Sequence, residues 1–216
     1  MPAGRRAARL ERRTRHAASC LSARTAPRRG RVLAVHELIL GGRRSGKSRC
    51  AETRAAEWLR RPGHDALLIA TALSGDAEMA RRIERHRAER AQRLPGLQTL
   101  EVPRALGPAL RSRSAARTLV VVDCLTLWLT QLLMPPGGAP GDASSCEGEL
   151  DELLDALRQA PGPVVLVSNE IGLGVTPLQR ETRQFLDTLG ELHQRVAALC
   201  ERVTLMVAGV ECRVKP

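Results

Sequence analysis

The chain has 216 residues, enough for one domain with a substantial core. Its formal net charge is +11, but residues 1–34 hold ten arginines and one acid, which leaves 24 basic and 22 acidic residues in 35–216. This near-neutral body has no basic face that would indicate nucleic-acid binding, and no apolar run approaches the ~18 residues of a membrane span. The six cysteines form no C-x-x-C pair, so we expect a cytoplasmic protein with reduced thiols and no zinc site.

Residues 1–34 differ from the rest of the chain. They are rich in arginine, poor in acids and lack the apolar segment of a secretory signal. We expect either a disordered tail or a true translation start near Val35; a targeting peptide or an RNA-binding segment is the alternative. The predicted organisation is therefore a tail over 1–34 and a single catalytic domain over 35–216.

The predicted elements alternate between strands and helices. An apolar run at 36–42 is followed by a Gly-rich turn and a helix over 47–61, then by a strand at 66–72 and a helix over 76–93 that Asp76 can cap. Continuous Val-rich runs at 118–124 and 163–169 are typical of central parallel strands that are covered on both faces. Further on we expect a helix over 125–133, a flexible insertion over 134–145, helices near 147–159 and 177–200, and a strand over 202–209.

The segment "GGRRSGKS", Gly41 to Ser48, matches the P-loop pattern G-x-x-x-x-G-K-[ST] between a predicted strand and a predicted helix. Its glycines would let backbone N–H groups wrap phosphates, Lys47 would reach the β- and γ-phosphates, and the Ser48 hydroxyl would bind Mg²⁺. A plain Gly-rich turn is the structural alternative. The expected fold is an α/β, RecA-like P-loop NTPase domain with a doubly wound, mostly parallel sheet and helices on both faces.

Asp123 ends the strand "LVVVD" and is the candidate second metal ligand. An aspartate at this position could instead cap the following helix.

Seven segments, in this order, carry a resemblance to a known family: "HELILGGRRSGKS", "IATA", "DAEMARRIERHRAER", "TLEVP", "VVVDCLTLWLTQLL", "VVLVSNEIGLGV" and "VAGVECRVK". They resemble the bifunctional adenosylcobinamide kinases and adenosylcobinamide-phosphate guanylyltransferases of cobalamin biosynthesis, over about 36–215. The resemblance implies phosphorylation of adenosylcobinamide by ATP or GTP. It also implies transfer of GMP from GTP to adenosylcobinamide phosphate through a guanylylated histidine, and a homo-oligomer, a trimer.

The histidine of the family's I-x-x-H-R pattern falls on His86. On a helix, Met79, Ile83, His86 and Arg90 recur at spacings of four, three and four, so they share one face directed at the protein. The cations Arg82 and Arg90 would also stabilise a leaving pyrophosphate. The alternative is a partly buried histidine with a single hydrogen bond and no chemical role.

The other nucleotide contacts come from the resemblance, at matching positions. A carboxylate such as Glu101 can accept hydrogen bonds from N1–H and the exocyclic amine of guanine, although an ordinary solvated strand-edge acid is its alternative. The implied contacts are Gly41, Gly42, Arg43, Arg44, Ser45, Gly46, Lys47, Ser48, Ala70, Thr71, Ala72, Arg87, Ala88, Glu89, Arg90, Glu101 and Asp123.

The chain also departs from the family pattern. Ala91 follows Arg90 where proline is usual, and Leu97 takes the place of a tryptophan after a spacing three residues longer. Leu186 replaces an arginine, and Gln131 and His193 stand where asparagine is usual.

Two other functions fit parts of the sequence. A small-molecule P-loop kinase with a structural His86 would transfer phosphate without covalent GMP. A nucleotide-regulated protein that binds RNA through its Arg-rich tail would depend on residues 1–34, but the near-neutral body disfavours it.

Overall fold

The computed structural model describes residues 34–73, 77–135 and 143–216. Strands and helices alternate along this part of the chain. They are β1 (Glu37–Gly41), α1 (Lys47–Leu59), β2 (Asp65–Ala70), α2 (Ala77–Arg93), β3 (Leu97–Glu101), α3 (Leu106–Arg113), β4 (Thr118–Asp123), α4 (Leu125–Leu133), α5 (Ala143–Gln159), β5 (Val164–Val167), α6 (Arg180–Leu199), β6 (Arg202–Val207) and β7 (Val210–Lys215).

The strands form one sheet in the order β3-β2-β4-β5-β1-β6-β7. β1 to β6 pair in parallel, and β7 pairs antiparallel with β6 at the edge. β5 is buried at all four positions, as expected for a Val-rich central strand covered on both faces. The predicted α/β, RecA-like P-loop fold with a mostly parallel sheet is therefore confirmed.

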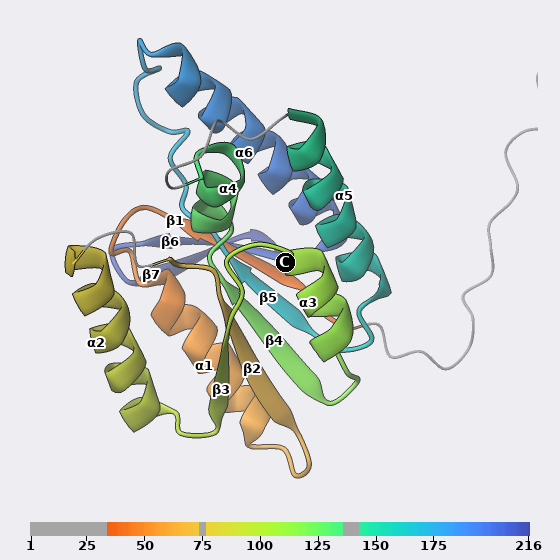
Figure 1. Ribbon diagram of the computed structural model, residues 1–216. Coiled ribbons are helices and arrows are strands. Elements are labelled where there is room, and N and C mark those ends of the chain that lie inside the picture. Colours follow the sequence, from red (N-terminus) through yellow and green to blue (C-terminus); the bar gives the residue numbers. More distant parts are fainter. Residues whose placement is uncertain (1–33, 74–76, 136–142) are drawn as a thin grey trace, which may run out of the picture. The chain divides into compact units, whose positions relative to one another are not determined.

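Helices cover both faces of the sheet (Figure 1). α3, α4, α5 and α6 pack leucines and Trp128 against one face and form the larger hydrophobic cluster. α1 covers the other face with Cys50, Ala51 and Ala55 and forms the smaller cluster. α2 lies beside α1 and contributes no buried side chain to either cluster among the described residues (Figure 1).

Several element boundaries differ from the sequence-based predictions. α3 and β7 were not predicted, because a short helix and an exposed edge strand carry little hydrophobic periodicity. The predicted strand over 202–209 ends at Val207, where Ala208 and Gly209 have positive φ and turn the chain into β7. α5 begins at Ala143, inside the predicted insertion, and α6 begins at Arg180 rather than at 177.

Some predictions fall outside the described residues. These are the tail up to residue 33, the cap at Asp76, the side chains of Met79 and Arg82, and most of the insertion. Within the described part of the chain, no helix is long and apolar enough to cross a membrane.

Candidate active site

The P-loop connects β1 to α1 and wraps around its own lysine. Lys47 Nζ donates a hydrogen bond to the carbonyl of Gly42 at 2.7 Å, and the lysine side chain is buried. Gly46 precedes the helix with φ +100°, a left-handed conformation that favours glycine, and no side chain caps the helix there. The first N–H groups of α1 are therefore directed at the space where a phosphate would bind.

The turn between β6 and β7 supports the P-loop from behind. The Gly209 N–H donates to the Ser45 carbonyl at 3.0 Å, and a Cβ on Gly41 would come within 2.5 Å of the Met206 carbonyl. On the other side, the Glu170 N–H donates to the Gly41 carbonyl at 3.0 Å. Backbone hydrogen bonds from two separate segments thus hold the loop in place.

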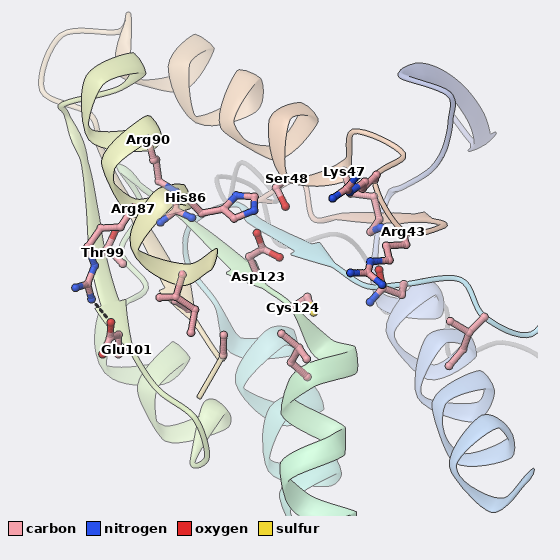
Figure 2. A pocket seen from close by; sticks show the side chains of 17 residues that line it. Arg43, Lys47, Ser48, His86, Arg87, Arg90, Thr99, Glu101, Asp123 and Cys124 are labelled. Atoms are coloured by element: carbon pink, nitrogen blue, oxygen red, sulfur yellow. Dashed lines mark hydrogen bonds and ion pairs between the residues drawn. The ribbon is translucent and has the colours of Figure 1, made fainter. Parts of the chain in front are cut away.

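A cavity of about 380 Å³ opens at the carboxyl ends of the central strands. Lys47 and Ser48 line it from the P-loop, Asp123 from the end of β4, and His86 from α2. Figure 2 shows the His86 ring directed toward Ser48 and Asp123. The cavity thus joins a phosphate-binding loop, two oxygen donors suited to a hard cation, and an imidazole.

His86 also borders a second cavity, of about 610 Å³, between the P-loop and α2. The two cavities share Arg43, Arg44, Lys47, Ser48 and His86. Ile83 and Arg90 line the first cavity together with His86, as the helical spacing predicts. His86 is half-buried, and no hydrogen bond joins its ring to another described residue.

Asp123 is available to the cavity rather than engaged as a helix cap. The N-cap of α4 is Cys124, which makes no side-chain capping bond. Burial raises the pKa of the Cys124 thiol to about 12, so this neighbouring sulfur stays protonated and is a poor nucleophile. His86 is the one histidine among the described residues that line this cavity.

Ion pairs hold α2 in position. Arg93 Nη2 lies 2.9 Å from Glu52 Oε2 on α1, and Arg90 Nε lies 3.5 Å from Glu52 Oε1. At the far wall, Arg87 pairs with Glu101 at the end of β3 (Figure 2). The histidine therefore stands on a helix that charged side chains, rather than a packed hydrophobic face, attach to the fold.

The family model described as "Cobinamide kinase / cobinamide phosphate guanyltransferase" matches residues 37–214. The bifunctional adenosylcobalamin biosynthesis protein CobP of Pseudomonas aeruginosa is 49% identical over 181 residues, covering 84% of this chain and 98% of that protein. This chain belongs to the cobinamide kinase / cobinamide phosphate guanyltransferase family. CobU of Salmonella typhimurium is 34% identical over 186 residues, 82% of this chain and 98% of that one.

Among solved structures, the flagellar accessory protein FlaH from Methanocaldococcus jannaschii is similar with a TM-score of 0.48 and 11% identity, over 84% of this chain and 78% of that chain. Membership rests on the family model and the curated relatives. The resemblance read from the seven sequence segments is therefore confirmed, and the chain is a bifunctional enzyme of cobalamin biosynthesis, a kinase and a guanylyltransferase.

The structure brings most of the expected nucleotide-binding residues of this family member to one place, and others lie behind them. Arg43, Arg44, Lys47, Ser48, Ala70, Ala72, His86, Arg87, Arg90, Glu101 and Asp123 line the first cavity. Ser45, Gly46 and Glu89 line the second. Neither cavity, within the described part of the chain, is lined by the remaining four: Gly41, Gly42, Thr71 and Ala88. Thr71 is fully buried, and its hydroxyl donates to the Cys124 carbonyl at 2.7 Å, so it braces the cavity wall.

Sequence reasoning missed several residues of the cavity wall. Asn169 and Ile171 follow β5, and Thr99 lies on β3. The rule that ligands bind at the carboxyl ends of parallel strands would have pointed to Asn169, which lies two residues beyond the end of β5.

A buried polar chain fixes Asn169. Its N–H donates to Thr126 Oγ1 at 2.8 Å, Thr126 and Ser168 share a hydrogen bond of 2.9 Å, and His193 Nε2 lies 2.8 Å from Ser168 Oγ. Burial lowers the pKa of His193, so its imidazole is neutral at pH 7. His193, a departure from the family pattern, thus takes part in the support of the cavity wall.

Two other departures from the family pattern, Leu97 and Gln131, can be located in the structure. Leu97 is buried in the hydrophobic cluster on the α1 face, while Thr99 and Glu101 of the same strand line the cavity. Gln131 donates a hydrogen bond to the Thr71 carbonyl, next to the cavity wall. The altered segment 91–97 contains the end of α2 and the start of β3. None of its residues lines the first cavity, whereas Arg93 lines the second.

Proposed function

We propose that this enzyme phosphorylates the aminopropanol hydroxyl of adenosylcobinamide with ATP or GTP. It then transfers GMP from GTP to the new phosphate through a guanylylated His86, giving adenosylcobinamide-GDP and pyrophosphate. The observation that carries this proposal is that His86 lines the same cavity as the P-loop residues Lys47 and Ser48.

For the kinase reaction, Lys47 and the N–H groups at the start of α1 bind the β- and γ-phosphates. The lysine first leaves the Gly42 carbonyl, which accepts its hydrogen bond in the structure. The hydroxyl oxygen of adenosylcobinamide then forms a bond to the γ-phosphorus as the bond to the β-phosphate oxygen breaks, and the hydroxyl proton passes to water.

Ser48 and Asp123 would hold Mg²⁺ in this reaction. One hydroxyl and one carboxylate line the cavity beside the P-loop, and oxygen donors suit this hard cation, which usually takes one or two carboxylates plus phosphate oxygens. When bound, Mg²⁺ supplies charge neutralisation on the phosphates. Lys47 and Arg43 add fixed positive charge to the same wall.

For the transfer reaction, the neutral His86 imidazole attacks the α-phosphorus of GTP. An N–P bond forms as the P–O bond to pyrophosphate breaks, and Arg90 and Lys47 stabilise the charge that develops on the leaving group. A phosphate oxygen of adenosylcobinamide phosphate then attacks the same phosphorus, and the N–P bond breaks. The imidazole returns to its starting state.

Glu101 would select guanine at the far wall. Its carboxylate can accept from N1–H and the exocyclic amine of guanine, two donors that adenine does not present together. In the structure Glu101 pairs with Arg87, and both side chains are about half exposed, so the carboxylate can exchange a guanidinium for a base at modest cost.

The deciding experiment is incubation of the full chain with α-³²P-labelled GTP and Mg²⁺, followed by acid and base treatment. We expect a base-stable, acid-labile label that His86→Ala abolishes while kinase activity persists. His64→Ala, a histidine in the turn before β2, is the matched control and should keep the label. An unlabelled wild-type protein would reject the covalent His86 mechanism.

Two expectations from the sequence accompany this proposal. The cytoplasm is the proposed compartment, and the five cysteines of the described residues are free thiols that suit a reducing environment. The trimer that the resemblance implies stays a prediction, which light scattering would check.

A further inference from the structure

The loop over 169–179 joins β5 to α6 beside the cavity. β5 lies between β4, which ends in Asp123, and β1, which leads into the P-loop, so the loop leaves the sheet between these two functional strand ends. Its first residues are fixed, because the Glu170 N–H bonds the Gly41 carbonyl and Asn169 and Ile171 line the cavity.

The middle of this loop carries a run of exposed aliphatic side chains. Ile171, Leu173, Val175 and Leu178 are 40%, 83%, 96% and 92% exposed. They are four of the ten large hydrophobic residues that are exposed in the described part of the chain, and they fall within eight positions. We name these four residues the apolar strap. Such a cluster, continuous with a ligand cavity, indicates a surface that is covered during function.

Contacts at both ends hold the strap in place. The Gly172 N–H donates to Glu170 Oε1 at 2.7 Å, and Arg183 of α6 donates to the carbonyls of Pro177 at 3.1 Å and Leu178 at 2.5 Å. These bonds engage the backbone and leave the aliphatic side chains outside the hydrophobic core. The strap is thus anchored without burying its own apolar groups.

The two sides of the cavity differ in chemistry. The side of β3 and α2 carries Arg87, Arg90 and Glu101, which suit a polar base and phosphates. The opposite side, across β4, carries the P-loop arginines Arg43 and Arg44 and, after β5, Asn169 and Ile171. Ile171 is the cavity-lining residue from which the chain leads into the rest of the strap. The acceptor needs its hydroxyl at the P-loop, but a macrocycle is too large for a cavity of about 380 Å³ that also holds phosphates, so the ring must rest at the rim.

We propose that the apolar strap is the docking surface for the corrin macrocycle of the acceptor. The methyl-bearing ring would cover Leu173, Val175 and Leu178 while the aminopropanol arm passes Ile171 toward Lys47. This inference rests on the proposed function, since it takes a corrinoid as the acceptor. It adds where the acceptor binds and which residues discriminate a corrinoid from a small alcohol.

The test uses the full chain with Val175→Ser and Leu178→Ser combined. The matched control is Val210→Ser with Val214→Ser, two exposed apolar residues on the edge strand β7, 64% and 65% exposed. Kinase assays with adenosylcobinamide give KM and kcat, GTP binding is titrated separately, and (R)-1-aminopropan-2-ol serves as an acceptor without the macrocycle.

We expect the strap variant to raise the KM for adenosylcobinamide by about tenfold, because two apolar contacts with the ring are lost. Its GTP affinity, its kcat at saturating acceptor and its activity on the small alcohol should stay within about twofold of the wild type. The control variant should match the wild type throughout. An unchanged KM in the strap variant overturns the proposal, and so does a change of oligomeric mass with an unchanged KM, which would assign the strap to contacts between copies.

Failure of the proposed function is visible separately. A wild-type protein that does not phosphorylate adenosylcobinamide rejects the function before any variant is tested. Equilibrium dialysis of adenosylcobinamide against wild type and strap variant then still tests docking, since weaker binding to the variant alone supports it and equal binding overturns it.

Discussion

The two walls of the cavity are held by different forces. The P-loop wall is fixed by backbone hydrogen bonds from Gly209 and Glu170 and by the packed ends of β1 and β4. The α2 wall is attached through ion pairs with Glu52 and Glu101. Arg87 and Arg93 are about half exposed in these pairs, whereas the Arg90–Glu52 pair is largely buried. Exposed ion pairs contribute little stability and rearrange readily. Packed strand ends are close-packed and keep their positions.

This difference in attachment suggests that the two walls serve different steps of the reactions. A fixed wall suits phosphate binding, which both reactions need. An adjustable wall would suit the role that we propose for His86, which meets an α-phosphate and then presents GMP to a second substrate. Damage to the first wall should therefore affect both reactions, and damage to the second should affect mainly guanylyl transfer.

The largest effect is expected from Lys47→Ala. Loss of the proposed phosphate-binding cation should lower kcat of the kinase by roughly 10²- to 10³-fold, and guanylyl transfer should fall with it because we propose that both reactions bind the triphosphate here. Steady-state kinetics of both reactions measure this. Lys215→Ala, which alters the other lysine of the chain, is the control. Full guanylyl transfer in Lys47→Ala would show that the walls act independently.

The next largest effect is expected from Glu101→Gln. If Glu101 accepts from guanine as we propose, removing its charge should reduce discrimination between GTP and ATP in the transfer reaction by about 10- to 100-fold, since a hydrogen bond to a charged group contributes ~1.5–3 kcal/mol. Competition between labelled GTP and unlabelled ATP measures the ratio. Glu84→Gln alters the other carboxylate near Arg87, at 3.7 Å and outside the cavity lining, and should leave discrimination intact. An equal loss of GTP/ATP discrimination in both variants would mean that the effect acts through Arg87 rather than through Glu101.

A smaller effect is expected from Arg93→Ala, which removes one of the ion pairs between α2 and Glu52. Guanylyl transfer should slow by about three- to tenfold while the kinase rate stays within twofold, and the free energy of unfolding should fall by less than ~1 kcal/mol. Arg158→Ala removes a similar exposed pair, with Asp155 in α5, and is the control. A parallel loss of kinase activity would contradict the division between the two walls.

The smallest effect is expected on the pH dependence of stability, through the buried histidines His36 and His193. Burial lowers the pKa of His36 and of His193 from 6.5 in the folded protein, so the unfolded chain binds more protons below pH 6.5. Stability should therefore be lost as the pH falls through the range below 6.5, by at most ~1.4 kcal/mol per pH unit for each histidine. Thermal unfolding of His193→Asn between pH 7.5 and 5.5 should show a shallower decline than the wild type. Identical declines would mean that His193 is not protonated on unfolding.

Prediction from the sequence succeeded where a local pattern sets the structure. The helix over 125–133 was predicted with its observed bounds, and the Val-rich runs became β4 and β5, because long apolar segments need burial whatever their neighbours. It failed at β7, whose six residues are all exposed, because the pairing with β6 rather than any periodicity makes this segment a strand.

The candidate site shows the same limit. The P-loop could be identified from glycine and lysine spacing, because the loop's own backbone creates the phosphate site. His86 needed the resemblance, since an isolated histidine on a charged helix has no local signature of chemistry. The Arg87–Glu101 pair and the contribution of Ile171 could not be foreseen, because they depend on how distant strands are ordered in the sheet.

The α/β alternation and the P-loop can be predicted from the sequence alone, because hydrophobic patterns and motif spacing act over a few neighbouring residues, and the family follows from the resemblance of seven segments. The position of β5 between β4 and β1 is set by the tertiary structure. That strand order places the loop after β5 beside the P-loop and puts Glu101 on the opposite wall, next to the helix that bears His86. Long-range strand pairing sets these positions, and no stretch of sequence carries that information alone.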